Sequence, residues 1–236
     1  MTRVPRLDGE TASAPIAPKF HTRNVNPRLP GWGGCFPSSV KTNAQYAGVP
    51  QADVDRFWAA AQREIGKNGS TINDMVNMIR RTMPKEKYFA STEADPRILD
   101  TLSRKGVAVA STMGWGERYV DQFGRPIRIS HAISLAHYRE GARACVVDSN
   151  FPGEFFWMPA AEYAARWLAN GHLALALTRL PAGVVIAIKV GVVAGAVLLA
   201  VASLSLFGVS LVAIVATLIP RPPEPTPDAL PAFSFA

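Results

Sequence analysis

The stretch Gly-Trp-Gly-Gly-Cys-Phe-Pro-Ser-Ser at residues 31–39 places a cysteine between a glycine-rich turn and a predicted helix. The helix is expected to begin at Cys35, to tolerate Pro37 in its first turn and to end near Gly48. A side chain at a helix N-terminus faces unpaired backbone N–H groups and the positive end of the helix dipole, which favour a thiolate over a thiol. Cys35 is therefore a candidate nucleophile, and the alternative is an ordinary buried cysteine after a loop.

A predicted β-hairpin further along the chain carries groups that could activate this cysteine. Residues 129–138 and 142–148 are apolar enough for two strands, and Arg-Glu-Gly at 139–141 indicates a turn between them. Antiparallel pairing would bring His131, near the start of the first strand, beside Asp148, at the end of the second. Cysteine, histidine and aspartate then supply a nucleophile, a base and a carboxylate that orients the base.

These residues resemble the papain-like cysteine peptidases, and most closely the branch that processes bacteriocin leader peptides at double-glycine sites. The resemblance lies in Cys35 opening a helix, His131 in an apolar strand, and Asp148 seventeen residues after the histidine. It covers residues 24–178, and the segment 156–167 resembles the closing helix of that branch. The resemblance implies an α+β fold, in which helices carrying the nucleophile pack on an antiparallel sheet carrying the other two groups.

The sequence departs from the family at the oxyanion donor. The family usually has a glutamine six residues before the cysteine, but here that position is Leu29, and no glutamine precedes Cys35. Asn26 or Arg28 is a candidate replacement, or the Cys35 backbone N–H acts with little help from side chains. The departure therefore leaves two hypotheses, an active thiol hydrolase and a papain-like scaffold that has lost its chemistry.

Two tryptophans are candidates for the walls of a substrate cleft. Trp32 precedes the cysteine, and Trp115 lies in a stretch at 113–124 that is rich in glycine and aromatic residues. That stretch is expected to be a loop leading to the histidine strand, and such loops often line clefts. The alternative is an ordinary connection with a packed tryptophan.

The second histidine of the hairpin is the weaker candidate for the base. His137 follows His131 by six residues, so both should project from one face of the strand. His137 lies beside the turn, however, far along the hairpin from Asp148, and His131 is preferred. Strand alternation also directs Cys145 away from Asp148, so that Cys145 is expected in the core.

Composition excludes several other classes of protein. The 236 residues include only two cysteines, without the spacing of a disulfide scaffold or a zinc finger. The four histidines do not have metal-ligand spacing, so neither a metal nor a cofactor is expected. The net charge of +7 is scattered along the chain and no nucleic-acid motif is present, so no specific nucleic-acid partner is expected.

The ends of the chain differ from its centre. Residues 1–30 are expected to form an extended arm without a signal peptide, and residues 31–178 the peptidase domain. Residues 182–219 carry a single charge and predict a membrane segment, either one long helix, which is favoured, or a hairpin. Its Gly191-x-x-x-Gly195 pattern could support oligomers. Residues 220–236 are a proline-rich tail.

The opening residues 3–18 resemble the N-terminal arm of many tailed-phage virion proteins. Together these features predict a membrane-anchored thiol hydrolase of the virion, delivered into the host cell envelope. Its substrate would be a peptide or amide bond in peptidoglycan cross-bridges or in a protein, and the helix and arm could support homo-oligomers or virion assembly. The alternative is a structural or ejection component whose helix forms part of a membrane conduit.

Overall fold

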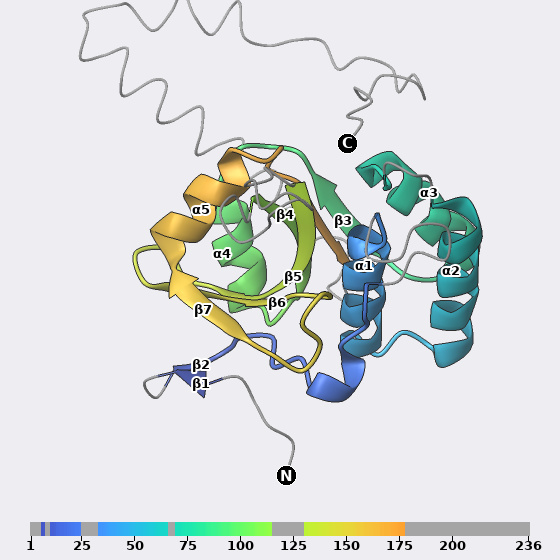
Figure 1. Ribbon diagram of the computed structural model, residues 1–236, viewed down its shortest axis with the longest axis horizontal. Helices are drawn as coiled ribbons and strands as arrows, with labels where there is room; N and C mark the ends of the chain where they lie inside the picture. The colour runs from blue at the N-terminus through green and yellow to red at the C-terminus, as the bar shows by residue number, and fades with distance from the viewer. Residues whose placement is uncertain (1–5, 8–9, 25–32, 66–68, 115–129, 178–236) are drawn as a thin grey trace, which may run out of the picture. The chain divides into compact units, whose positions relative to one another are not determined.

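The computed structural model describes residues 6–7, 10–24, 33–65, 69–114 and 130–177, and the structural statements below concern these residues. Their main feature is a six-stranded sheet with helices on both faces, which confirms the predicted α+β class (Figure 1). The expected membrane segment at 182–219 and tail at 220–236 lie outside the described residues. Among the described residues, no helix combines the length and apolar character needed to cross a membrane.

All neighbouring strands of the sheet are antiparallel, in the order β3-β8-β4-β5-β6-β7. A separate two-stranded sheet pairs β1 (Arg6–Leu7) with β2 (Glu10–Thr11). The strands of the main sheet are β3 (Tyr88–Ser91), β4 (Val109–Gly114), β5 (Ser130–Tyr138), β6 (Arg143–Val147), β7 (Phe156–Pro159) and β8 (Ala174–Leu177). The helices are the 3₁₀ turn η1 (Pro18–Phe20), α1 (Cys35–Tyr46), α2 (Gln51–Glu64), α3 (Ile72–Thr82), α4 (Arg97–Arg104) and α5 (Ala160–Leu168).

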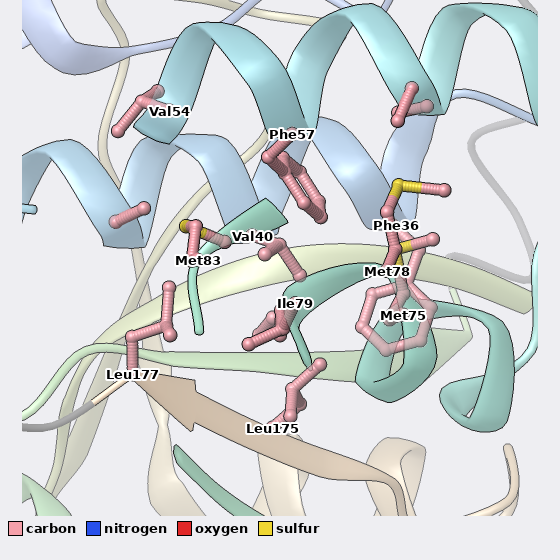
Figure 2. Packing of buried hydrophobic residues seen from close by; sticks show 14 of the residues in the cluster. Phe36, Val40, Val54, Phe57, Met75, Met78, Ile79, Met83, Leu175 and Leu177 are labelled. Carbon is pink, nitrogen blue, oxygen red and sulfur yellow. The ribbon is translucent and has the colours of Figure 1, made fainter. Parts of the chain in front are cut away.

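Helices α1, α2 and α3 share one apolar core with the edge of the sheet. Figure 2 shows Phe36 and Val40 of α1 facing Phe57 of α2, with Leu175 and Leu177 of β8 beneath them. Met75 and Ile79 of α3 lie in this core and are fully buried. Thr71 caps α3 through a capping box with Asp74. This core holds α1, and therefore its first residue, against the sheet.

Two segments have a different structure from the one predicted. Phe156–Pro159, the start of the stretch that resembles a closing helix, is a strand that pairs with β6, and the helical part of that stretch is α5, which begins at Ala160. The reason is Pro159, because proline disfavours helical backbone in the residue before it and is tolerated only at a helix start. Met113 and Gly114, expected in a loop, continue β4 because they pair with His131 and Ser130 of β5. The rest of that loop, 115–129, lies outside the described residues.

The extended segment 11–24 packs against the domain. Its small apolar side chains Ala12, Ala14 and Ile16 are buried in a second cluster with Cys145 and Val147 of β6. The backbone N–H of Ala14 also donates to the carbonyl of Ala136 at 2.8 Å. This segment runs from the far end of the β5–β6 hairpin towards the first turns of α1.

Candidate active site

The first residue of α1 is the candidate nucleophile. Gly33 has a positive φ of 74°, which lets the chain turn sharply into the helix. Helix α1 begins at Cys35 after Gly34, without a side-chain cap, so its first N–H groups remain available to the sulfur or to a bound substrate. Cys35 is only half-buried, as an attacking group must be.

Serine hydroxyls fix the start of α1 on β5. The Ser39 Oγ lies 3.0 Å from the carbonyl oxygen of Cys35 and 3.2 Å from that of Ala132. In return, the Ser134 hydroxyl donates to the carbonyl of Ser39 at 3.3 Å. These contacts join the first turn of the helix to the strand that carries the histidine, so that Cys35 and His131 meet.

The structure brings together the three residues predicted from the sequence. His131 Nε2 lies 2.7 Å from Asp148 Oδ1, and the His131 ring is also in hydrogen-bonding contact with the Cys35 thiol. His131 is 3% exposed and Asp148 is fully buried. The imidazole thus lies between thiol and carboxylate, which is the arrangement implied by the resemblance to papain-like peptidases.

The charges of the site favour an ion pair between Cys35 and His131. Burial opposes ionisation of the thiol, but the hydrogen bond and positive charge of His131, with the backbone N–H groups of Ala132 and Phe36, together lower the Cys35 pKa. Burial likewise opposes protonation of His131, but its hydrogen bonds to Asp148 and Cys35 outweigh this effect and raise its pKa above the usual value. Both shifts favour the thiolate–imidazolium form of the pair over the neutral form.

The second histidine occupies a different environment, and the expectation that it shares a face with His131 is wrong. β5 pairs Leu135 with Val146 but His137 with Cys145, so Ala136 is an extra residue that forms a bulge. The extra residue reverses the alternation and turns His137 to the face opposite His131. There His137 Nδ1 accepts from the backbone N–H of Ser13 at 3.2 Å and lies 2.8 Å from its hydroxyl.

Cys145 lies in the core as predicted. It is fully buried and burial raises its pKa. Among the described residues, no group of three or more histidine, cysteine, aspartate or glutamate side chains could hold a metal ion. The candidate oxyanion residues Asn26 and Arg28 and the candidate cleft residues Trp32 and Trp115 lie outside the described residues and stay predictions.

Sequence reasoning did not find two asparagines, one that donates to the Asp148 carboxylate and one that holds the first in place. The backbone N–H of Asn150 donates to Asp148 Oδ1 at 2.8 Å, and its side-chain oxygen accepts from Asn24 Nδ2 at 2.9 Å. The spacing Asp-x-Asn after a strand is a turn signal that points to Asn150. No comparable signal points to Asn24, because its partner lies 126 residues away.

Comparisons with known proteins find likenesses only among solved structures. No protein-family model matches the chain, and no curated protein sequence matches it significantly. One similar structure is described as a C39-like peptidase from Bacillus anthracis, with 16% identity, a TM-score of 0.49, and coverage of 68% of this chain and 96% of that one. Another is the peptidase domain of Streptococcus ComA, a bifunctional ABC transporter of a quorum-sensing pathway, with 13% identity, a TM-score of 0.45, and coverage of 66% and 98%. With similarity this low, the chemistry of the site rests on this chain's own geometry.

Proposed function

We propose that the chain is a cysteine peptidase or amidase in which Cys35 is the nucleophile, His131 the acid and base, and Asp148 the orienting carboxylate. A single observation carries the proposal, namely that the His131 ring contacts the Cys35 thiol while its Nε2 lies 2.7 Å from a buried carboxylate oxygen. Three groups from separate elements converge in the order that thiol hydrolysis requires.

The geometry supports a two-step acyl transfer. The Cys35 thiolate attacks the carbonyl carbon of the scissile bond, and the charge that develops on the oxygen faces the free N–H groups at the start of α1. The His131 imidazolium then gives its proton to the leaving amine, and a thioester remains on Cys35. Neutral His131 next takes a proton from water, and the resulting hydroxide attacks the thioester carbonyl. The C–S bond breaks, the carboxylic acid product leaves, and the Cys35 thiolate and His131 imidazolium are restored. Asp148 keeps the imidazole in the required tautomer throughout.

The buried charges favour the enzyme over an inactive scaffold. A buried carboxylate beside a buried imidazole costs stability unless every group is well paired, and apolar residues of similar size would pack at least as well. Asp148 Oδ2 is buried without a hydrogen-bond partner in the described part of the chain, so the arrangement is not optimised for stability. A histidine with a strongly raised pKa beside a partly buried cysteine with a lowered pKa is typical of catalytic sites.

Hydrolysis of a library of fluorogenic peptides by the purified full chain tests the proposal. We expect turnover of at least one member, trapping of Cys35 as an acyl-enzyme by a peptidyl electrophile, and loss of both in Cys35→Ser. The matched control is Cys145→Ser, which replaces the other cysteine and should leave turnover unchanged. If the library is not cleaved, and an electrophile labels Cys35 equally well in wild type and His131→Ala, the protein is a scaffold.

Membrane anchoring and action at a cell envelope are a further part of the proposal. They are supported by the apolar run at 182–219 and by the resemblance of residues 3–18 to phage virion arms. Such an anchor would hold the catalytic domain near peptidoglycan cross-bridges or envelope proteins. Flotation of the full chain with liposomes, and its loss on deletion of residues 182–236, tests this part separately from catalysis.

A further inference from the structure

The segment 21–24, which we call the strap, contacts both halves of the candidate site. On one side it reaches α1, where the Ser38 hydroxyl donates to the Arg23 carbonyl at 3.2 Å and the Thr22 N–H donates to Thr42 Oγ1 at 3.0 Å. Ser38 is in the same helical turn as the nucleophile. The strap is therefore fixed to the helix that carries Cys35.

On its other side the strap holds the turn that carries the carboxylate. The Asn24 N–H donates to the Ser149 carbonyl at 2.8 Å, and Asn24 Nδ2 donates to Asn150 Oδ1 at 2.9 Å. Further along the same turn, the N–H of Gly153 donates to His21 Nδ1 at 2.8 Å. The strap thus joins the turn after Asp148 to the helix of the nucleophile.

A short chain of contacts leads from Asn24 to the imidazole. Asn24 fixes the Asn150 amide, the Asn150 N–H donates to Asp148 Oδ1 at 2.8 Å, and the same oxygen lies 2.7 Å from His131 Nε2. The Asn150 side-chain nitrogen also lies 3.4 Å from His131 Nε2. A shift of this turn would therefore move the carboxylate relative to the ring.

The burial of Asn24 indicates a role other than stability. The residue is 9% exposed, and its Oδ1 is buried without a hydrogen-bond partner among the described residues. A buried amide with one unpaired atom costs free energy that an apolar residue of the same size would not. Such a cost is typical of residues that hold a functional site in place.

From this geometry we infer that Asn24 is a positioning residue, which holds the Asp148–Asn150 turn against His131 and so maintains the Cys35–His131 ion pair. The inference rests on the proposed function. It makes the N-terminal segment part of the active site, although this segment precedes the predicted domain boundary at residue 31. Without the Asn24 side chain the carboxylate would stabilise the imidazolium less, and the imidazolium would stabilise the thiolate less.

The rate of Cys35 alkylation by iodoacetamide, measured against pH on the full chain by mass spectrometry, tests the inference without a known substrate. In Asn24→Ala we expect the acid side of the profile to move to higher pH, towards that of an ordinary thiol, and turnover of any cleaved peptide to fall about tenfold to a hundredfold. In the double variant Asn24→Ala, Asn150→Ala the profile should move by less than the sum of the two single shifts, since the two side chains share one hydrogen bond.

The matched control is Ser13→Ala, which removes another hydrogen bond between the same N-terminal segment and a buried side chain, His137, but does not touch the turn. Its profile should equal that of wild type. Asn24→Leu, which fills the same volume without hydrogen bonding, replaces Asn24→Ala if the latter does not fold. An unchanged profile in the folded Asn24 variant, with a wild-type profile displaced to low pH, overturns this inference alone. A wild-type profile like that of a free thiol overturns the proposed function and the inference with it.

Discussion

The two ends of the β5–β6 hairpin each bury a histidine beside a cysteine, yet the two histidines have different partners. His131 lies between the Cys35 thiol and the Asp148 carboxylate. His137 instead accepts a hydrogen bond from the Ser13 N–H, and its ring centroid lies 5.6 Å from that of Trp157. Each histidine is at most 3% exposed. Burial alone therefore does not make a histidine a candidate base. The groups that contact its ring distinguish His131 from His137.

The cysteines differ in the same way. Cys35 lies at a helix start with an imidazole and two backbone N–H groups near its sulfur, and its pKa is lowered. Cys145 lies in the middle of β6 among apolar side chains, and its pKa is raised because burial disfavours the thiolate. Substitutions at the two ends should consequently have separate effects, which the following experiments measure.

The largest difference should appear in turnover. We expect His131→Ala to lower kcat about 10²–10⁴-fold, since it removes the acid and base. His137→Gln, which can still accept the Ser13 N–H, should leave kcat within about twofold because its ring lies on the other face of the strand. Peptide hydrolysis by both variants at equal folded concentration is the measurement. Equal losses of kcat in the two variants would remove the distinction between the ends.

A smaller but sharper difference should appear in thiol reactivity. Because the Cys35 pKa is lowered, the thiolate should form at a lower pH than in a free thiol. Because the His131 pKa is raised, its imidazole should stay protonated at a higher pH than is usual for histidine. The ion pair should then persist across neutral pH, and at about pH 6 Cys35 should alkylate at least roughly tenfold faster than glutathione.

Cys145 provides the internal control for this experiment. It is fully buried, and the raised pKa leaves it as a thiol, so it should be alkylated only after unfolding in urea. Peptide mapping by mass spectrometry separates the two sites. Faster labelling of Cys145 than of Cys35 in the native protein would contradict the assignment of the two ends.

The sequence predicted the surroundings of His131 correctly but not those of His137, and the reasons are physical. A hairpin with a tight turn has its strand ends paired whatever happens along it, so His131 and Asp148 could be placed together from their positions alone. The face of His137 depends on the bulge at Ala136, which no glycine or proline marks. The pairing of His131 with Asp148 depends only on the strand topology and was predicted correctly. The face of His137 depends on the exact register of the two strands and was predicted wrongly.

The packing of the N-terminal segment had a signal that its composition obscured. Ala12, Ala14 and Ile16 alternate with Ser13 and Pro15, which is the period of a half-buried extended chain. The neighbouring prolines and small residues favoured the interpretation of an extended arm outside the peptidase domain. The contact between Asn24 and Asn150 has no local signal at all, because only the folded chain brings residues so distant in sequence together.

The smallest expected effect concerns stability at the His137 end. Ser13→Ala removes a hydroxyl 2.8 Å from His137 Nδ1 but keeps the backbone N–H that donates to the same nitrogen at 3.2 Å. The ring nitrogen stays paired, so the free energy of unfolding should fall by only about 1 kcal/mol, the usual net value of one hydrogen bond. Urea denaturation followed by tryptophan fluorescence measures the change.

Thr71→Ala, which removes the cap of α3 far from the hairpin, should lower the free energy of unfolding by a similar ~1 kcal/mol and calibrates the assay. Peptide hydrolysis should be unchanged in both variants. If Ser13→Ala instead lowers turnover tenfold or moves the pH profile of Cys35, the His137 end takes part in the chemistry, and the contrast between the two ends is wrong.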